Sequence, residues 1–159
     1  MTSQPPIPAH DPPAPIIDSQ HVVSHFLTSM AVGDVTAAVA LVDDHIDYTN
    51  VSLPTLHGKK STAAVLGLLA KPWAGFGVVV HNIVGEGDVV LTERTDELKV
   101  GPLVAQFWVC GRFEVREGRI TVWRDYFDWF DVTKGLVRGL VAIVVPPLRR
   151  RLPAPEITG

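Results

Sequence analysis

Charged residues are scarce in this chain of 159 residues: Asp, Glu, Lys and Arg together make up 19% and leave a net charge of −3. A protein that binds nucleic acid through its phosphates usually carries an excess of positive charge. The charge balance therefore predicts that nucleic acid is not a partner.

Cysteine and long apolar runs are nearly absent as well. Cys110 is the only cysteine, so no internal disulfide can form, and no CxxC pair is present to hold a metal. The first residues contain neither the basic nor the apolar stretch of a signal peptide. The longest apolar run, residues 139–147, is far shorter than the ~20 residues of a membrane-spanning helix. We expect a cytoplasmic protein with no metal and no membrane span.

Hydrophobic residues, by contrast, make up 47% of the chain, which is enough to form one core. Six of the thirteen prolines lie between Pro5 and Pro15, where they prevent helix and sheet from propagating. We therefore expect a disordered proline-rich tail over residues 1–16, a single domain over residues 17–148, and a C-terminal tail over residues 149–159.

Hydrophobic periodicity predicts helices first and strands afterwards. Helical spacing covers residues 18–33, 34–42 and 60–70, and period-two alternation predicts strands at 46–50, 76–84, 89–100, 103–116 and 119–128. A last helix follows Thr133 and ends at Pro146. This order favours an α+β fold over alternating βαβ units. We expect a curved, mixed but mostly antiparallel sheet that forms a cone around the N-terminal helices.

The predicted strand over residues 89–100 carries charged residues on both faces. Arg94 and Asp96 share a face with Leu98, because every second residue of a strand points the same way. Leu98 therefore assigns Arg94 and Asp96 to the interior. We expect the opposite face to be solvated; it carries Glu93, Thr95 and Glu97.

The last predicted strand places Asp125 on one face with two aromatic residues, Trp123 and Phe127. A carboxylate in apolar surroundings is unfavourable unless it is paired, so Asp125 needs a partner. Tyr48 and Asn50 share a face of the first strand. Structural explanations exist for each feature, because Arg and Asp on one strand often form a surface salt bridge and Asn often starts a turn.

Three motifs, taken in order, resemble the limonene-1,2-epoxide hydrolase family. They are Y-x-N at residues 48–50, LTER-x-D at 91–96 and WRDYFD at 123–128, and the similarity extends over roughly residues 18–148. From Gly101 onward the chain looks especially like the mycobacterial members, which are associated with larger lipophilic epoxides. The resemblance implies a cone-shaped fold of the nuclear-transport-factor-like type, a homodimer, and no cofactor.

The same resemblance implies a role for each polar residue of the motifs. Asp125 would be the base that activates water, and Asp96 would be the acid that protonates the epoxide oxygen. Arg94 would bridge the two carboxylates, while Tyr48 and Asn50 would hold the water.

Elementary chemistry supports this assignment, because opening an epoxide needs a nucleophile at carbon and a proton for the departing oxygen. Two neighbouring carboxyls in an apolar cavity titrate apart, so one can act as base while the other acts as acid. We therefore expect an epoxide hydrolase that adds water to a small lipophilic epoxide in one step, giving a vicinal diol without a covalent intermediate. Leu98 and Phe127 are expected to line the substrate pocket, bordered by segments 51–58 and 73–77.

Two other functions are compatible with the same fold. One is a non-catalytic carrier of a hydrophobic ligand, and the other is an isomerase or cyclase that uses a pocket carboxylate. The apolar helix over residues 136–145, which precedes the arginines at 149–151, has three possible uses: a dimer contact, a pocket lid or a membrane-surface contact.

Overall fold

The computed structural model describes residues 18–148 and 152–153, so the predicted tail over residues 1–16 and most of the predicted tail over 149–159 lie outside the described residues. The helices are α1 (Ser19–Ala31), α2 (Val35–Ala40), α3 (Lys59–Leu69), α4 (Trp129–Val144) and the short 3-10 helix η1 (Pro146–Leu148). The strands are β1 (Val42–Asn50), β2 (Leu56–His57), β3 (Ala74–Glu86), β4 (Val89–Val100), β5 (Leu103–Arg116) and β6 (Arg119–Tyr126).

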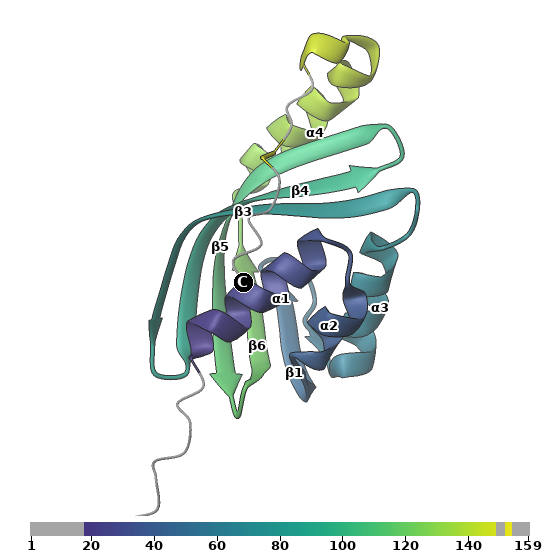
Figure 1. Ribbon diagram of the computed structural model, residues 1–159. Helices are drawn as coiled ribbons and strands as arrows, with labels where there is room; N and C mark the ends of the chain where they lie inside the picture. The colour runs from purple at the N-terminus through teal and green to yellow at the C-terminus, as the bar shows by residue number, and fades with distance from the viewer. Residues whose placement is uncertain (1–17, 149–151, 154–159) are drawn as a thin grey trace, which may run out of the picture.

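The six strands form one sheet in the order β2-β1-β6-β5-β4-β3. Neighbouring strands are antiparallel except β1 and β6, which pair in parallel. Figure 1 shows the sheet curving around α1, α2 and α3, which cover its concave face, while α4 lies apart from them beyond the end of β6. The predicted α+β class and the mixed, mostly antiparallel sheet are confirmed.

Helix α1 supplies most of the helical side of the core. The Asp18 carboxylate caps it by accepting a hydrogen bond from the backbone N–H of Gln20 at 3.0 Å. Its apolar stripe turns toward the sheet, and Phe26 at its centre is fully buried. The Phe26 ring contacts Trp123 and Phe113 edge-on, with centroid distances of 5.1 and 6.4 Å. These contacts form a buried aromatic core between α1 and the sheet.

Several element boundaries differ from the prediction, among them those of β1, β2, β6 and α4. Strand β1 begins at Val42 instead of residue 46, and the two-residue strand β2 occupies part of a segment expected to be a loop. Strand β6 ends at Tyr126, because the Asp128 carboxylate accepts a hydrogen bond from the backbone N–H of Phe130 and starts α4 at Trp129.

Glu97 is buried, contrary to the expectation that its face of β4 is solvated. Only 4% of the residue is exposed. Its carboxylate accepts a hydrogen bond from Gln106 Nε2 at 2.6 Å and pairs with Lys99 Nζ at 3.1 Å. Leu152 lies against the neighbouring Gly77 and covers the same part of the sheet. Residues distant in the sequence therefore cover this carboxylate, and strand periodicity alone does not reveal them.

Helix α4 is strongly apolar, and many of its large side chains are exposed, among them Val137, Leu140 and Val144. Of the residues that the structure describes, none form a helix with both the length and the apolar character needed to cross a membrane.

Candidate active site

A cavity of about 390 Å³ lies between the helices and the concave face of the sheet. That volume is within the range of small-molecule sites. The polar side chains in its wall are Tyr48, Asn50, Asp96 and Asp125. The remaining lining is apolar or aromatic: Met30, Leu53, Val65, Leu69, Phe76, Leu98, Val100, Leu103, Ala105, Phe107, Val109, Trp123, Phe127, Trp129, Val132 and Leu136. Leu98 and Phe127 lie where the sequence places them, and the two bordering segments contribute Leu53 and Phe76.

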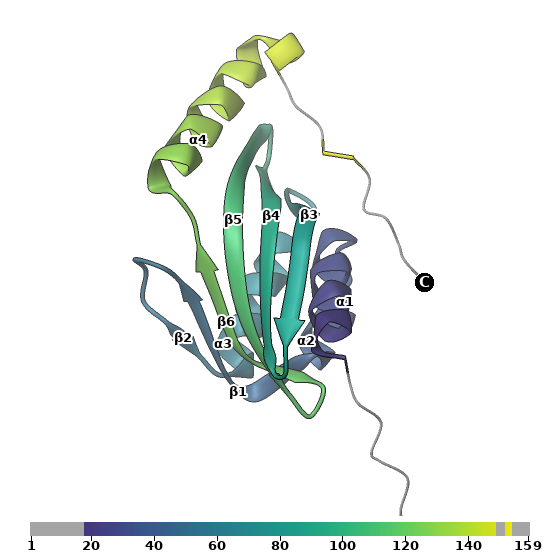
Figure 2. The ribbon, with the colours of Figure 1, turned by 90° about the vertical axis from the view of Figure 1, so that its left-hand side faces the viewer.

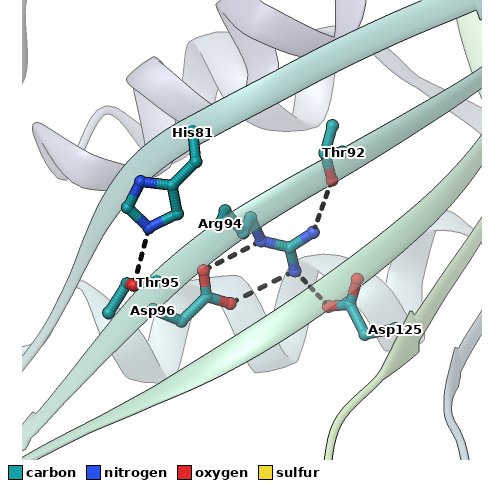
Figure 3. A network of polar contacts seen from close by, with 6 residues as sticks. All are labelled: His81, Thr92, Arg94, Thr95, Asp96 and Asp125. Carbon is teal, nitrogen blue, oxygen red and sulfur yellow. Dashed lines mark hydrogen bonds and ion pairs between the residues drawn. The ribbon is translucent and has the colours of Figure 1, made fainter.

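Arg94 lies at the base of this cavity and is fully buried. Its Nε donates to Asp96 Oδ1 at 2.8 Å, and its Nη2 donates to Asp96 Oδ2 at 3.2 Å (Figure 3). Nη1 donates to Thr92 Oγ1 at 3.1 Å. A guanidinium carries five N–H donors in a rigid fork, and each of its three nitrogens has an acceptor here.

Asp125 is the second carboxylate partner of Arg94. Its Oδ2 lies 2.6 Å from Nη2, so a single nitrogen donates to both aspartates (Figure 3). The other oxygen of Asp125, Oδ1, is buried and accepts no hydrogen bond from the described residues. A buried carboxylate oxygen without a donor is costly, so a ligand that can donate a proton is stabilised there.

Gly111 makes the bridge between the two aspartates possible. Arg94 belongs to β4 and Asp125 to β6. Because β5 runs between them, the backbones of β4 and β6 are about 10 Å apart. In the register of the sheet Gly111 pairs with Thr92 on one side and with Asp125 on the other. A Cβ at Gly111 would overlap Arg94 Nη1 and Thr92 Oγ1. The guanidinium therefore crosses β5 through the space that this glycine leaves.

Burial raises the pKa of Asp96 to about 6, and the negative charge of Asp125 adds to the increase, while the Arg94 guanidinium acts in the opposite direction. Burial alone would lower the pKa of Arg94, but the two carboxylates raise it above its ordinary value, so the guanidinium stays charged. One permanent positive charge thus faces two carboxyl groups, of which Asp96 holds its proton to an unusually high pH.

Tyr48 and Asn50 enter the site from β1. The parallel pairing of β1 with β6 sets Tyr48 beside Trp123 and Asn50 beside Asp125. The rings of Tyr48 and Trp123 stack with centroids 4.0 Å apart, and Asn50 Nδ2 donates to the Tyr48 hydroxyl oxygen at 2.8 Å. Burial, followed by the charge of Asp125, raises the pKa of Tyr48, so its hydroxyl remains a donor. All five polar residues of the motifs are therefore brought together.

Sequence reasoning missed two contributions to this site. Gly111 carries no side chain, and a glycine in the interior of a long strand was the available signal of a close approach. The part of the cavity wall that α1 and α3 form with Met30, Val65 and Leu69 was also missed, because those residues have the ordinary spacing of core positions.

The fold and the site together define a class of protein: a cone-shaped α+β domain with an arginine-bridged carboxylate pair at the base of an apolar pocket. Such a pair is suited to acid–base catalysis. Residues 17–138 match the model of the limonene-1,2-epoxide hydrolase catalytic domain. The chain belongs to the limonene-1,2-epoxide hydrolase family.

Similarity to individual proteins agrees with this assignment. The chain is 48% identical to epoxide hydrolase EphG of Mycobacterium tuberculosis over 130 residues, which is 82% of this chain and 87% of that protein. A solved structure of an M. tuberculosis epoxide hydrolase of this family superposes with a TM-score of 0.81 at 47% identity, covering 84% of this chain and 95% of the other.

More distant structures show the fold alone. A nuclear-transport-factor-like protein from Cytophaga hutchinsonii matches with a TM-score of 0.59 at 18% identity, over 70% of this chain and 91% of that one. A protein of ketosteroid isomerase-like fold from Catenulispora acidiphila matches with a TM-score of 0.64 at 14% identity, over 73% of this chain and 92% of the other.

The role of Gly111 predicts that Gly111→Ala displaces Arg94 and lowers turnover by about 10²-fold or more, because the bridge between the carboxylates is broken. Gly75→Ala is the matched control, since Gly75 is also a strand glycine and an added Cβ there meets only the Lys99 side chain, no closer than 3.4 Å. Initial rates of epoxide hydrolysis by the two variants check this prediction. Equal rates for Gly111→Ala and Gly75→Ala would contradict the role assigned to Gly111.

The raised pKa of Asp96 predicts a pH-dependent loss of stability. Between about pH 4 and pH 6 the folded state holds a proton that the unfolded chain has released, so stability falls as the pH rises through this window. The loss approaches about 3 kcal/mol above pH 6, at 1.36 kcal/mol per pKa unit. Asp96→Asn removes this component, so its unfolding free energy relative to the unsubstituted protein should increase from pH 4 to pH 7.

Urea unfolding at several pH values measures that difference. The exposed Asp88→Asn is the control, because it removes a carboxylate without touching the buried network. Parallel pH profiles for Asp96→Asn and the unsubstituted protein would show that Asp96 does not hold its proton in the folded state.

Proposed function

We propose that this protein is an epoxide hydrolase that adds water to a lipophilic epoxide in one step and releases a vicinal diol. The observation that carries the proposal is a buried guanidinium, Arg94, shared by two carboxylates in an apolar pocket. The family assignment and the similarity to a named epoxide hydrolase support the same reaction.

Asp125 is the proposed base. Its Oδ2 is held by Arg94, which leaves the buried Oδ1 to accept a proton from water. Tyr48 and Asn50 lie beside it on the paired strand, and together they offer a hydroxyl and an amide to orient that water. Orientation of the nucleophile lowers the entropic part of the barrier, and proton removal increases its nucleophilicity.

Asp96 is the proposed acid. Its raised pKa keeps a fraction of the carboxyl protonated near neutral pH, and its Oδ2 makes the longer of the two contacts with Arg94. That oxygen is therefore the better position for the proton. Water oxygen forms a bond to one epoxide carbon while the ring C–O bond breaks, and the proton of Asp96 passes to the departing oxygen. Asp125 keeps the proton taken from water until that proton passes to the ionised Asp96, which restores both carboxyls to their starting states.

The walls of the pocket favour a lipophilic substrate, because apolar and aromatic side chains cover all but the reacting end. We further propose that the protein is a homodimer, as the family resemblance implies, and that it acts in the cytoplasm, as its single cysteine suggests. Exposed aromatic side chains at Trp108, Tyr126 and Phe130 support an interface of this kind.

A hydrophobic-ligand carrier and an isomerase or cyclase remain the competing functions on this fold. A carrier has no need of two carboxylates around one buried arginine, since such a cluster is costly to bury. An isomerase that moves a proton with one carboxylate can use a second, protonated carboxyl, but it needs neither an arginine that bridges the two carboxyls nor an oriented water. Diol formation from cyclic and long-chain epoxides separates these functions, and tight binding without turnover would favour the carrier.

Asp125→Asn should lower the rate of diol formation by about 10³-fold or more, because the amide cannot accept the proton of water. The fold should be retained, since the amide oxygen can still accept from Arg94. Asp88→Asn, an exposed carboxylate away from the pocket, should keep full activity. Chromatographic measurement of the diol checks both variants, and substantial activity in Asp125→Asn would exclude Asp125 as the base.

A further inference from the structure

Helix α4 lies along the part of strand β5 that β6 leaves uncovered. Strand β6 pairs with β5 only from Cys110 onward, so residues 103–109 of β5 have a strand neighbour on the β4 side alone. Figure 2 shows α4 running beside this segment after the turn that follows β6. An uncovered strand edge exposes backbone polar groups, and a helix is one of the elements that cover such edges.

The contacts between α4 and β5 repeat in register. Asp131 Oδ2 accepts a hydrogen bond from the backbone N–H of Trp108 at 3.0 Å. A Cβ at Gly135 would overlap the carbonyl oxygen of Gln106, and one at Gly139 would overlap that of Val104. Each step of four residues along the helix therefore matches a step of two residues back along the strand.

The dimensions of the two elements explain this register. Four helical residues rise about 6 Å, and two strand residues advance about 6.8 Å. The helix can follow the strand over these three contact points only if it approaches closely, and a glycine at the second and third points allows that approach. At the first point Asp131 supplies the acceptor that β6 no longer provides. Three residues of α4 thus hold the helix against the sheet.

A second face of the same helix borders the substrate pocket. Trp129, Val132 and Leu136 line the cavity at spacings of three and four residues. Leu136 is 40% exposed and so lies at the mouth of the pocket rather than at its base. Because Leu136 follows Gly135, it lies close to the level of Ala105 on β5, which pairs with Leu98 on β4. Leu98 is two residues, or about 7 Å, along β4 from Asp96.

We propose that α4 is the specificity-determining wall of the pocket, and that Asp131, Gly135 and Gly139 are positioning residues that hold this wall in place. The inference rests on the proposed function and adds to it a discrimination by length. A compact epoxide reacts next to the aspartates without reaching Leu136. A substrate with an extended apolar chain passes Leu136, and its affinity depends on the position of α4. Among a dimer contact, a pocket lid and a membrane contact, this assigns α4 to the pocket.

The contact is tested with two leucines on one helix. Leu136→Ala should raise KM for 1,2-epoxydodecane by about tenfold, because apolar contact with the chain is lost. Its kcat/KM for cyclohexene oxide should stay within about twofold of the unsubstituted value, since that substrate does not reach residue 136. Leu140→Ala is the matched control: Leu140 is 56% exposed and does not line the cavity, so both substrates should be unaffected.

The positioning role is tested with two helical glycines. Gly135→Ala should force α4 away from β5 and raise KM for the long substrate at least as much as Leu136→Ala. Gly67→Ala, in helix α3, has no atom within 4 Å of the added Cβ and should leave both substrates unchanged. Asp131→Ala should shift the ratio of the two kcat/KM values in the same direction, and Asp131→Asn, which keeps an acceptor for the Trp108 N–H, should restore it.

A ratio of long-chain to compact kcat/KM that is the same in Gly135→Ala, Leu136→Ala and the unsubstituted protein would overturn the inference. Failure of the proposed function gives a different result, namely no turnover of either epoxide by the unsubstituted protein. In that case the affinity for dodecane-1,2-diol, measured by calorimetry, tests whether α4 forms the wall of the pocket. Weaker binding to Gly135→Ala and Leu136→Ala than to Gly67→Ala and Leu140→Ala would support the wall, and equal binding would overturn it.

Discussion

The structure of this protein depends on one buried positive charge. Arg94 is fully buried at the base of the cavity, and a charge in that position is tolerated only when it is paired and hydrogen-bonded. Two carboxylates pair with it, which leaves one negative charge in excess if both are ionised. A proton on one carboxyl removes the excess, and burial places it on Asp96. The arrangement that balances charge in the core is therefore also the arrangement that prepares an acid and a base.

The sheet is organised around that cluster. Three adjacent strands supply its parts: β4 carries Arg94 and Asp96, β6 carries Asp125, and β5 leaves room between them at Gly111. The parallel pairing of β1 with β6 adds Tyr48 and Asn50 beside Asp125. The helices cover the concave face and Arg94, Asp96 and Asp125 are buried, which strengthens the electrostatic interactions among them. In this way a single curved sheet produces both the core and the site.

Most of the site could be predicted from the sequence because the polar residues lie on strands whose alternation is clear. The bounds of β4 and β5 follow from period two and from the glycine turns between strands, and Leu98 correctly identified the interior face of Arg94 and Asp96. The roles of the individual residues in catalysis came from family resemblance, since alternation alone is equally consistent with a salt bridge.

What could not be predicted depends on contacts between distant segments. The passage at Gly111 appears only when the registers of β4 and β6 against β5 are both known, because the residue contributes no side chain. Strand β2 has two residues, too few for a periodic signal. Glu97 is buried by Gln106 and by Leu152, which lies more than fifty residues further along the chain. Each of these features requires the tertiary structure.

The central claim, that the carboxylate pair directs water itself onto the epoxide, is tested most directly by a single turnover in oxygen-18 water with enzyme in excess over substrate. The account predicts that the label enters the diol and that the carboxylates of Asp96 and Asp125 remain unlabelled. Label in either carboxylate, with an unlabelled diol, would show that the protein attacks the epoxide first and would contradict the account.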